Sequence, residues 1–438
     1  MNVAVFGLGY VGTVTAAILA AHDHEVRAVD VDPPKVRLVA SGRSPVSEPG
    51  LDELVAAGAV SGRLRATRDA GEALAGARLS LVCVGTPSSS IGSTDLRHVL
   101  AVIDDIGRSL AAEGSASPHA VVIRSTVPPG TVEDLLTPRL RSALAGAPVR
   151  VGIGMCPELL REGSAIADFY DSPITVLGTD DHQVVSAVEE VLGFLGSPVR
   201  VVAPREAEAL KYACNAFHAT KISFVNELGR LLRLLGVDAR RVMTLFCEDT
   251  KLNLSARYLA PGFAFGGSCL PKDLRSLLYL ARANFVDLPL LAGTMATNQL
   301  SIADVVNRVV ATDARTIALL GITFKMLSDD VRESPYVDLA ETLIGKGFDV
   351  RIHDPAVDVD RMVGENRRYF ESKLPHVRRA LRPSAADALD HADLALVSSS
   401  DPAVVDALVQ HPPPRTIDLN GRLGPIIEGL PGYEGVVW

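Results

Sequence analysis

The chain has 438 residues, 47% of them hydrophobic and 22% charged, with a formal net charge of −9. This length exceeds what one hydrophobic core supports, so we expect two or three domains. The negative charge argues against a nucleic-acid surface and a polybasic membrane anchor, although a local cationic pocket for an anionic ligand remains compatible with it. The five cysteines form no C-x-x-C pair, which predicts neither a disulfide framework nor a metal site and favours a reducing cytoplasm.

The first part of the chain alternates between apolar strands and helices. A buried strand is expected at residues 2–6, then a glycine turn, a helix over about residues 11–21 and a second strand that ends at Asp30 and Asp32. Continuous apolar stretches predict further strands at residues 79–85, 119–126, 149–155 and 173–178. Such strands, separated by helices, indicate a parallel sheet covered on both faces, and we assign it to residues 1–203.

The N-terminal apolar stretch is expected to be folded sequence. No Lys or Arg precedes it and three glycines interrupt it, unlike a signal peptide. No other stretch is apolar for long enough to span a bilayer, so we expect no membrane partner.

The pattern becomes helical near residue 204. Residues 205–235 contain no proline and repeat apolar residues at helical spacing, which predicts one long helix, and helical patterns continue to about residue 309. We therefore expect a helical connector over residues 204–309. Strands are predicted again at residues 316–321, 348–354, 394–400 and 415–420.

A weak internal repeat relates the two ends of the chain. "VRAVDVDP" near the start resembles "VRIHDP" at residues 350–355, and each closes a second strand. The predicted fold class is therefore α/β, with two doubly wound Rossmann-like domains joined by a long central helix and the connector. The second domain would span residues 310–438, and it lacks the glycine pattern of the first.

Gly7, Gly9 and Gly12 form G-x-G-x-x-G between a predicted strand and helix, and Asp30 ends the next strand. This context makes the pattern a strong dinucleotide fingerprint. Gly7 permits the tight turn, Gly9 lets pyrophosphate approach backbone N–H groups, and Gly12 allows close helix packing. The Asp30 carboxylate would accept ribose hydroxyls and repel a 2′-phosphate, which favours NAD over NADP.

Two threonines follow later strands of the same sheet. Thr86 stands in "VGTP" and Thr126 in "RSTVPPG", both at carboxyl ends of strands. Ligands of open α/β sheets bind at this edge. The alternative is that both are ordinary strand-ending turn residues.

A polar stripe runs along the predicted long helix. Lys211, Asn215, His218 and Asn226 fall within about 80° of one another at helical spacing. A cation, two amides and an imidazole beside apolar neighbours suggest a pocket for a polar ligand. A solvated outer face is the alternative, although Asn is a poor helix former.

The stretch "FAFGGSCLPKD" places Cys269 at the start of a predicted helix. Pro271 fits the first turn, and Ser268 or Cys269 fits the cap position. The helix dipole and Lys272 favour the thiolate, whereas Asp273 opposes it. The preceding glycines remove bulk, so that another group can come close. The alternative is a buried structural cysteine.

A reactive thiol beside an NAD site suggests a particular chemistry. It can add to an aldehyde, give a thiohemiacetal that loses a second hydride, and leave a thioester for water to cleave. The product is a carboxylate. Hydrolysis requires a base, and "CPELLREG" supplies Glu158 and Glu162 after the strand that ends at Met155.

Along essentially its whole length the chain resembles the nucleotide-sugar 6-dehydrogenases. The matching motifs are "FGLGYVG", "VGTPS", "RSTVPPGT", "PELLREG", "KYACNAFHATK", "FGGSCLPKD" and "GITFK…DDVRESP". "KLNLSARY", "GFAFGGSCLPKD" and "FESKLPHV" look most like the members that oxidise GDP-mannose. The resemblance implies four-electron, NAD-dependent oxidation of GDP-mannose at C6, with UDP-glucose as the alternative substrate. The product would feed an acidic polysaccharide of the alginate type.

The resemblance also implies residue roles. Cys269 would be the nucleophile, Lys211 and Asn215 would hold the reacting oxygen, Asp273 and Thr126 would position water, and Glu158 or Glu162 would assist hydrolysis. The implied NAD contacts are Tyr10, Val11, Asp30, Lys35, Thr86, Thr126, Lys272 and Arg332. The implied sugar-nucleotide contacts are Glu162, Lys211, Asn215, His218, Asn226, Tyr258 and Lys325.

The family relationship further implies an interlocked homodimer, or a multiple of it, in which Arg257 and Tyr258 reach the partner's site. Two other interpretations remain open at this point. One is a simple two-electron dehydrogenase with a structural Cys269, and the other is a non-catalytic NAD-binding interaction protein.

Overall fold

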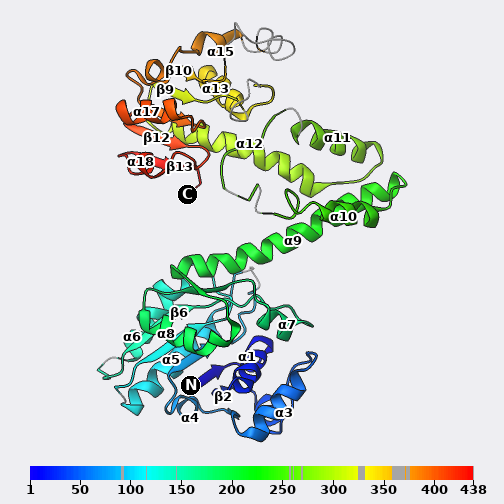
Figure 1. Ribbon diagram of the computed structural model, residues 1–438, viewed down its shortest axis with the longest axis vertical. Helices are drawn as coiled ribbons and strands as arrows, with labels where there is room; N and C mark the ends of the chain where they lie inside the picture. Colours follow the sequence, from blue (N-terminus) through cyan, green and yellow to red (C-terminus); the bar gives the residue numbers. More distant parts are fainter. Residues whose placement is uncertain are drawn as a thin grey trace. The chain divides into compact units, whose positions relative to one another are not determined.

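The computed structural model describes residues 1–89, 93–114, 116–144, 146–255, 258–259, 261–267, 270–323, 331–357, 370 and 375–437. The chain forms two compact units, Met1–Ala219 and Thr220–Trp438. The boundary between them falls inside helix α9 (Pro204–Leu234), which is 31 residues long. The predicted long helix is thus confirmed nearly to its ends (Figure 1).

The first unit is built on an eight-stranded sheet of order β3-β2-β1-β4-β5-β6-β7-β8. Its strands are β1 (Asn2–Phe6), β2 (Glu25–Val29), β3 (Leu64–Thr67), β4 (Leu79–Val82), β5 (His119–Ile123), β6 (Val151–Met155), β7 (Thr175–Gly178) and β8 (Val199–Val202). Its helices before α9 are α1 (Tyr10–Ala21), α2 (Pro33–Ala40), α3 (Leu51–Ser61), α4 (Ala70–Leu74), α5 (Arg97–Glu113), the π-helix η1 (Thr131–Leu136), α6 (Thr137–Ala143), α7 (Ala165–Tyr170), α8 (His182–Leu192) and the 3-10 helix η2 (Gly193–Leu195).

Alternate residues of the central strands enter two different cores. In β1, Val3 and Val5 face the core under α1, α3 and α8, whereas Ala4 and Phe6 face the core under α4, α5 and α6. Both faces are therefore buried, which explains why these strands are apolar without alternation. The strand pairs are parallel except β6–β7, which meets in antiparallel fashion at one residue pair, Met155 with Gly178.

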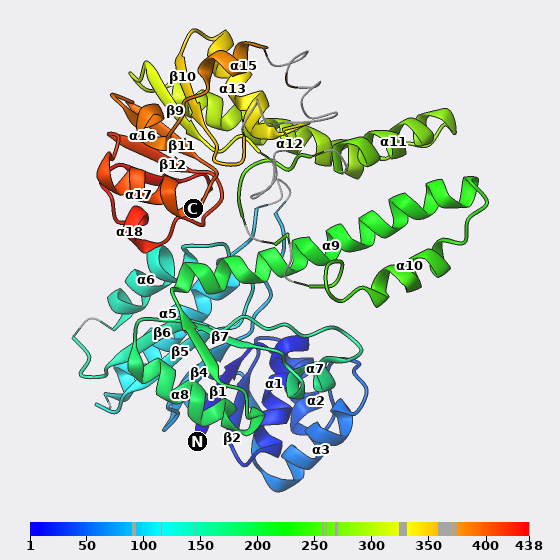
Figure 2. The same cartoon turned by 45° about the horizontal axis from the view of Figure 1, so that its top comes forward.

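The second unit carries the helices α10 (Ala239–Glu248), α11 (Leu270–Ala283) and α12 (Pro289–Val310) before its sheet. Figures 1 and 2 show α10 beside the C-terminal part of α9, where Phe224 and Phe246 lie 6.2 Å apart between ring centroids. A small core of Leu231, Ala281, Leu288 and Leu291 joins α9, α11 and α12. This region matches the predicted helical stretch.

The second sheet has five parallel strands in the order β10-β9-β11-β12-β13. Its strands are β9 (Thr316–Leu320), β10 (Asp349–His353), β11 (Leu394–Val397), β12 (Arg415–Asp418) and β13 (Tyr433–Gly435). Its helices are α13 (Pro335–Gly345), α15 (Pro375–Ala380), α16 (Ala385–Leu389), α17 (Pro402–Gln410) and α18 (Pro425–Glu428). Two doubly wound sheets with a long central helix confirm the predicted fold class. Within the described ranges, no helix has the length and apolarity needed to cross a bilayer.

Candidate active site

The glycine turn between β1 and α1 is shaped by close approaches. Gly7 has a φ of 101°, a left-handed conformation that glycine adopts without strain. A Cβ on Gly12 would lie 1.8 Å from the carbonyl oxygen of Gly7, so only glycine lets α1 pack onto the turn. A Cβ on Gly9 would meet nothing within 4 Å. The turn therefore leaves open space beside the N-terminus of α1, where backbone N–H groups bind phosphates.

Asp30 is held rigidly at the end of β2. Its side chain is 8% exposed, and its carboxylate accepts hydrogen bonds from the backbone N–H of Leu8 at 2.7 Å and of Asp32 at 2.9 Å. The Lys35 ammonium lies 3.4 Å from the same carboxylate. Asp30 is thus tied to the turn that contains Gly7 and Gly9, and its remaining lone pairs suit ribose hydroxyls.

The two strand-ending threonines lie together. Their strands end earlier than expected, β4 at Val82 and β5 at Ile123, because the chain leaves the sheet to form loops at this edge. The Thr86 hydroxyl donates to the carbonyl oxygen of Thr126 at 2.9 Å. Both loops therefore form one surface at the carboxyl edge of neighbouring strands.

The structure also joins two residues that are far apart in the sequence. The Lys211 ammonium lies 2.8 Å from a Glu158 oxygen, and their side chains are only 9% and 12% exposed. The other Glu158 oxygen accepts from the backbone N–H of Leu160 at 2.8 Å. A buried pair of this kind is sensitive to loss of either partner, because the remaining charge stays desolvated.

The rest of the polar stripe on α9 is exposed within the chain. Asn215 and His218 lie on the helix surface in the first unit, and Asn226 does so in the second. Of the four residues in the stripe, Lys211 is the one that is buried within the chain. The stripe therefore begins in a buried ion pair and continues on a surface that the described residues of the chain leave open.

Sequence reasoning missed one residue on the same helix. Glu208 is fully buried, and its carboxylate accepts from the backbone N–H of Gly130 at 2.5 Å and of Val132 at 2.8 Å. Burial raises the pKa of Glu208, against the opposing effect of these hydrogen bonds. Glu208 thereby fastens the loop that follows Thr126 to α9. The sequence offered one indication of this role, because Glu208 precedes Lys211 by three residues and therefore lies on the same helix face.

The loop that precedes Cys269 is fixed at alternate residues. Phe263 N–H donates to the Leu419 carbonyl at 2.9 Å, Phe265 exchanges two hydrogen bonds with the Asn298 side chain, and Gly267 N–H donates to the Glu333 carbonyl at 3.0 Å. A Cβ on Gly266 would lie 2.4 Å from both the Glu333 carbonyl oxygen and the Pro335 ring. The glycines were expected to leave room for another group to come close. That group is the chain's own backbone and proline ring at residues 333–335.

The remaining predicted residues of the second unit are partly described. Lys272 and Asp273 form an exposed pair at 2.9 Å near the start of α11, where Pro271 occupies the first turn as expected. Arg332 is half-buried. Tyr258 has a φ of 63° and is 84% exposed. The predicted residues Arg257, Cys269 and Lys325 lie outside the described residues.

A hollow of about 740 Å³ lies in the second unit, between Tyr258 and helix α12. Its lining residues include Phe263 and Phe265 of the cysteine loop and Thr294 and Thr297 of α12. This mixture of aromatic rings and hydroxyls is typical of sites that bind small polar ligands.

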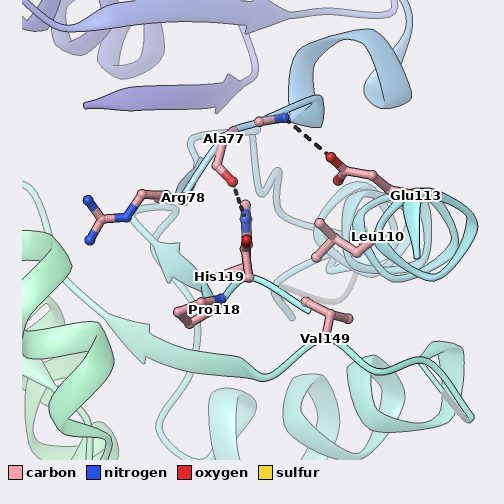
Figure 3. Close-up of a pocket in the computed structure, with 9 residues that line it drawn as sticks. Ala77, Arg78, Leu110, Glu113, Pro118, His119 and Val149 are labelled. Atoms are coloured by element: carbon pink, nitrogen blue, oxygen red, sulfur yellow. Dashed lines mark hydrogen bonds between the residues drawn. The ribbon is translucent and has the colours of Figure 1, made fainter. Parts of the chain in front are cut away.

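Figure 3 shows a different cavity, of about 290 Å³, where β4 and β5 begin. Buried His119 donates from Nδ1 to the Ala77 carbonyl at 2.9 Å. Its Nε2 accepts from the Ser80 hydroxyl at 2.8 Å. Glu113 accepts from Gly76 N–H at 3.4 Å. The cavity lies at the opposite ends of the strands from the glycine turn, and we do not include it in the site.

Three features of the first unit lie at the carboxyl ends of its strands. They are the glycine turn with Asp30, the loops that carry Thr86 and Thr126, and the Glu158–Lys211 pair. Tyr10 and Val11 begin α1, and Glu162 is exposed beyond Glu158. No group of three or more His, Cys, Asp or Glu among the described residues could hold a metal ion. These features define the class: a dinucleotide-binding protein with a polar, cation-containing site beside the nucleotide turn.

Comparison with known proteins identifies the family. Residues 1–193, 205–300 and 318–420 match the NAD binding, central and UDP binding domains of the UDP-glucose/GDP-mannose dehydrogenase family. The chain belongs to this family and is an NAD-dependent nucleotide-sugar dehydrogenase, which confirms the predicted family and cofactor.

Three relatives illustrate the similarity. The chain is 42% identical over 441 residues to GDP-mannose 6-dehydrogenase of Pseudomonas syringae pv. syringae, with 100% of both chains covered. It is 36% identical to a UDP-glucose 6-dehydrogenase of Bacillus subtilis, over 81% of this chain and 80% of that one. Its fold matches the crystal structure of a ternary complex of GDP-mannose dehydrogenase from Pseudomonas aeruginosa with a TM-score of 0.94 and 41% identity over 100% of each chain.

Proposed function

We propose that the chain oxidises C6 of GDP-mannose to GDP-mannuronate. The observation that carries this proposal is the full-length similarity to a GDP-mannose enzyme, at 42% identity and 100% coverage of both chains. Two UDP-glucose enzymes are less similar, at 36% identity over 81% and 91% of this chain.

The turn at Gly9 and the fixed carboxylate of Asp30 fit NAD, which when bound accepts one hydride in each of two oxidations. Gly7 and Gly12 shape the turn, while Tyr10, Val11, Lys35, Thr86, Thr126, Lys272 and Arg332 are the further proposed contacts. The acidic Asp30 beside the ribose position disfavours a 2′-phosphate.

The proposed chemistry runs through Cys269. Lys211 and Asn215 hold the substrate oxygen, and loss of a proton and a hydride converts the C6 alcohol into an aldehyde. The Cys269 thiolate adds to this carbonyl, and a second hydride loss leaves a thioester. Water cleaves the thioester to the acid and returns the thiol, with Asp273 and Thr126 positioning the water.

Glu158 is the proposed base for hydrolysis. Its ion pair with Lys211 at 2.8 Å places a carboxylate beside the ammonium that holds the substrate oxygen. A proton can pass between two groups that lie this close. Glu162, His218, Asn226, Arg257, Tyr258 and Lys325 are the remaining proposed contacts to the sugar nucleotide.

We further propose three functional regions, residues 1–203 for NAD, 204–309 for the cysteine loop and dimerisation, and 310–438 for the sugar nucleotide. Exposed apolar side chains along the middle region, including Phe217, Ile222 and Leu245, support an interlocked homodimer or a multiple of it. The four described cysteines are free, which suits a cytoplasmic enzyme. An acid product of this kind suits an acidic exopolysaccharide of the alginate type.

The test is the yield of NADH from limiting GDP-mannose, measured beside limiting UDP-glucose. We expect two NADH per GDP-mannose, none from UDP-glucose, and no acid from a Cys269→Ser variant that still binds NAD. Two NADH per UDP-glucose would preserve the chemistry and overturn the substrate. One NADH per sugar would overturn the thioester route, and NAD binding without turnover of any nucleotide sugar would favour an interaction protein.

A further inference from the structure

A buried carboxylate outside all the motifs links two parts of the first unit. Glu48 precedes α3 and is only 8% exposed. Its Oε1 accepts from the backbone N–H of Ala165 at 2.7 Å, and its Oε2 accepts from Gly163 N–H at 2.7 Å and from the Tyr10 hydroxyl. One side chain therefore receives donors from α1 and from the segment that follows Glu158.

The contact to Tyr10 ties this carboxylate to the glycine turn. Tyr10 is the first residue of α1, directly after Gly9, and its hydroxyl also accepts from Gly163 N–H at 2.8 Å. Burial and the hydrogen bond to Glu48 raise the pKa of Tyr10 to about 12, so the phenol remains a donor. Burial alone would raise the pKa of Glu48, but its hydrogen-bond donors outweigh this and lower it. The network is thus charge-assisted near neutral pH.

The contacts to the backbone fix a segment that Asp168 also holds, through the backbone N–H of Arg161 at 2.9 Å and the Arg161 guanidinium at 2.6 Å. The segment 158–165 starts with Glu158, which Lys211 holds at 2.8 Å, and ends at the two amides bound by Glu48. Glu162, between these anchors, is exposed. Gly163 has a φ of 87°, so the chain turns sharply where Glu48 binds it. Glu48 therefore anchors the C-terminal end of the segment to α1, whereas Asp168 binds Arg161 and Ser164 from within α7.

We propose that Glu48 is a positioning residue for thioester hydrolysis, because it clamps the segment carrying Glu158 and Glu162 to the cofactor helix through Tyr10. This inference rests on the proposed function. It concerns the step after hydride transfer, because the segment supplies the proposed base for hydrolysis. Glu48 also binds Tyr10, a proposed NAD contact, so the rates are compared at saturating NAD. A displacement of about 1 Å at a catalytic group can lower a rate up to about 100-fold.

The test compares Glu48→Gln and Glu48→Asp with wild type and with Glu53→Gln, an exposed neighbour on α3. Gln has the size of Glu but places an N–H₂ group against backbone N–H donors. Asp keeps the negative charge, but its side chain is one methylene shorter. Single-turnover reactions with excess enzyme follow NADH by absorbance and acid by chemical quench. Melting temperatures and NAD affinity are measured alongside.

We expect Glu48→Gln to slow acid formation roughly 10- to 100-fold while NADH formation changes less than about twofold. Glu48→Asp should fall between this variant and wild type, and Glu53→Gln should match wild type. If Glu48→Gln does not fold, Glu48→Asp supplies the comparison. Equal slowing of NADH and acid, or a lower melting temperature with unchanged rates, would overturn the inference while leaving the proposed function intact. Absence of acid from wild type with every nucleotide sugar would overturn both.

Discussion

Gly9 and Gly12 are three residues apart, yet their surroundings differ completely. Above Gly9 there is open space, whereas Gly12 faces the carbonyl oxygen of Gly7, 1.8 Å from where a Cβ would be. The same substitution should therefore affect different properties at the two positions: ligand approach at the first, and packing of α1 at the second.

We predict that Gly9→Ala lowers NAD affinity about tenfold or more, with little change in melting temperature, because the new methyl group occupies only the space that pyrophosphate needs. Gly12→Ala should lower both, since overpacking costs roughly 1–3 kcal/mol and displaces the turn. Calorimetric titration with NAD and thermal melting separate the two effects. A Gly9→Ala variant with unchanged NAD affinity would contradict this use of the turn.

At the residue scale, the sequence predicted contacts between residues that lie close together along the chain, but not contacts between distant ones. The glycines and Asp30 stand in a fixed local pattern, so their arrangement followed from the sequence. The Glu158–Lys211 pair joins positions 53 residues apart, and the polar stripe identified only the Lys211 half of it from helical spacing. Glu48 carries no local pattern, because its partners come from α1 and from the segment before α7.

At the level of elements, α12 supports the cysteine loop through one side chain. Asn298 is 8% exposed, and its amide accepts from Phe265 N–H at 2.7 Å and donates to the Phe265 carbonyl at 2.9 Å. This pairing resembles the exchange between two strands, although only one partner is backbone. It holds the loop four residues before the proposed nucleophile.

We predict that Asn298→Ala reduces turnover and changes the rate at which iodoacetamide alkylates Cys269, because two backbone groups of Phe265 lose their partners. Each such group costs about 1–3 kcal/mol if it stays buried and unpaired. Asn307→Ala, an exposed change on the same helix, serves as the control. Alkylation and turnover that match the control would show that the loop holds its position without Asn298.

Long buried elements were predictable, and short edge strands were not. The central strands and α9 are marked by continuous apolar sequence or helical spacing. The strands β3, β8 and β13 were missed because they lie at the edges of their sheets and have at most one buried residue each. Strand β4 is equally short but fully buried, and it was predicted. Strand β8 also has no buried residue, so hydrophobic patterning gives it no signal.

Across the whole molecule, the weak sequence repeat corresponds to a repeated turn. Leu8 N–H donates to Asp30 at 2.7 Å, and Ile322 N–H donates to Asp354 at 2.8 Å in the second unit. The Asp354 oxygen also receives both the N–H and the hydroxyl of Thr323, at 2.9 and 3.0 Å. The second carboxylate is therefore occupied by its own chain, which gives a physical reason for the different uses we propose for the two sheets.

The stability of the whole chain should depend on pH through His119. Burial lowers its pKa from the ordinary value, against the opposing hydrogen bond to Ala77. Above the unfolded pKa of about 6.5 the imidazole is neutral in both states, and its contribution to stability is complete. Below that value the unfolded chain binds a proton first, so stability falls by up to about 1.4 kcal/mol per pH unit until the folded pKa is reached.

We therefore predict that His119→Gln loses less stability than wild type between about pH 7.5 and about pH 5.5, because Gln can hydrogen-bond at this position without titrating. Urea unfolding midpoints at both pH values give the comparison. His98→Gln, an exposed change on α5, should retain the wild-type dependence. Carboxylates with lowered pKa values, such as Asp95 and Asp168 at about 2, lose their contribution only at lower pH and leave this window unaffected. Burial also lowers the pKa of His24, but both proteins carry that residue, so its contribution cancels in the comparison. Equal pH dependence in His119→Gln and wild type would mean that the His119 imidazole does not link protonation to folding.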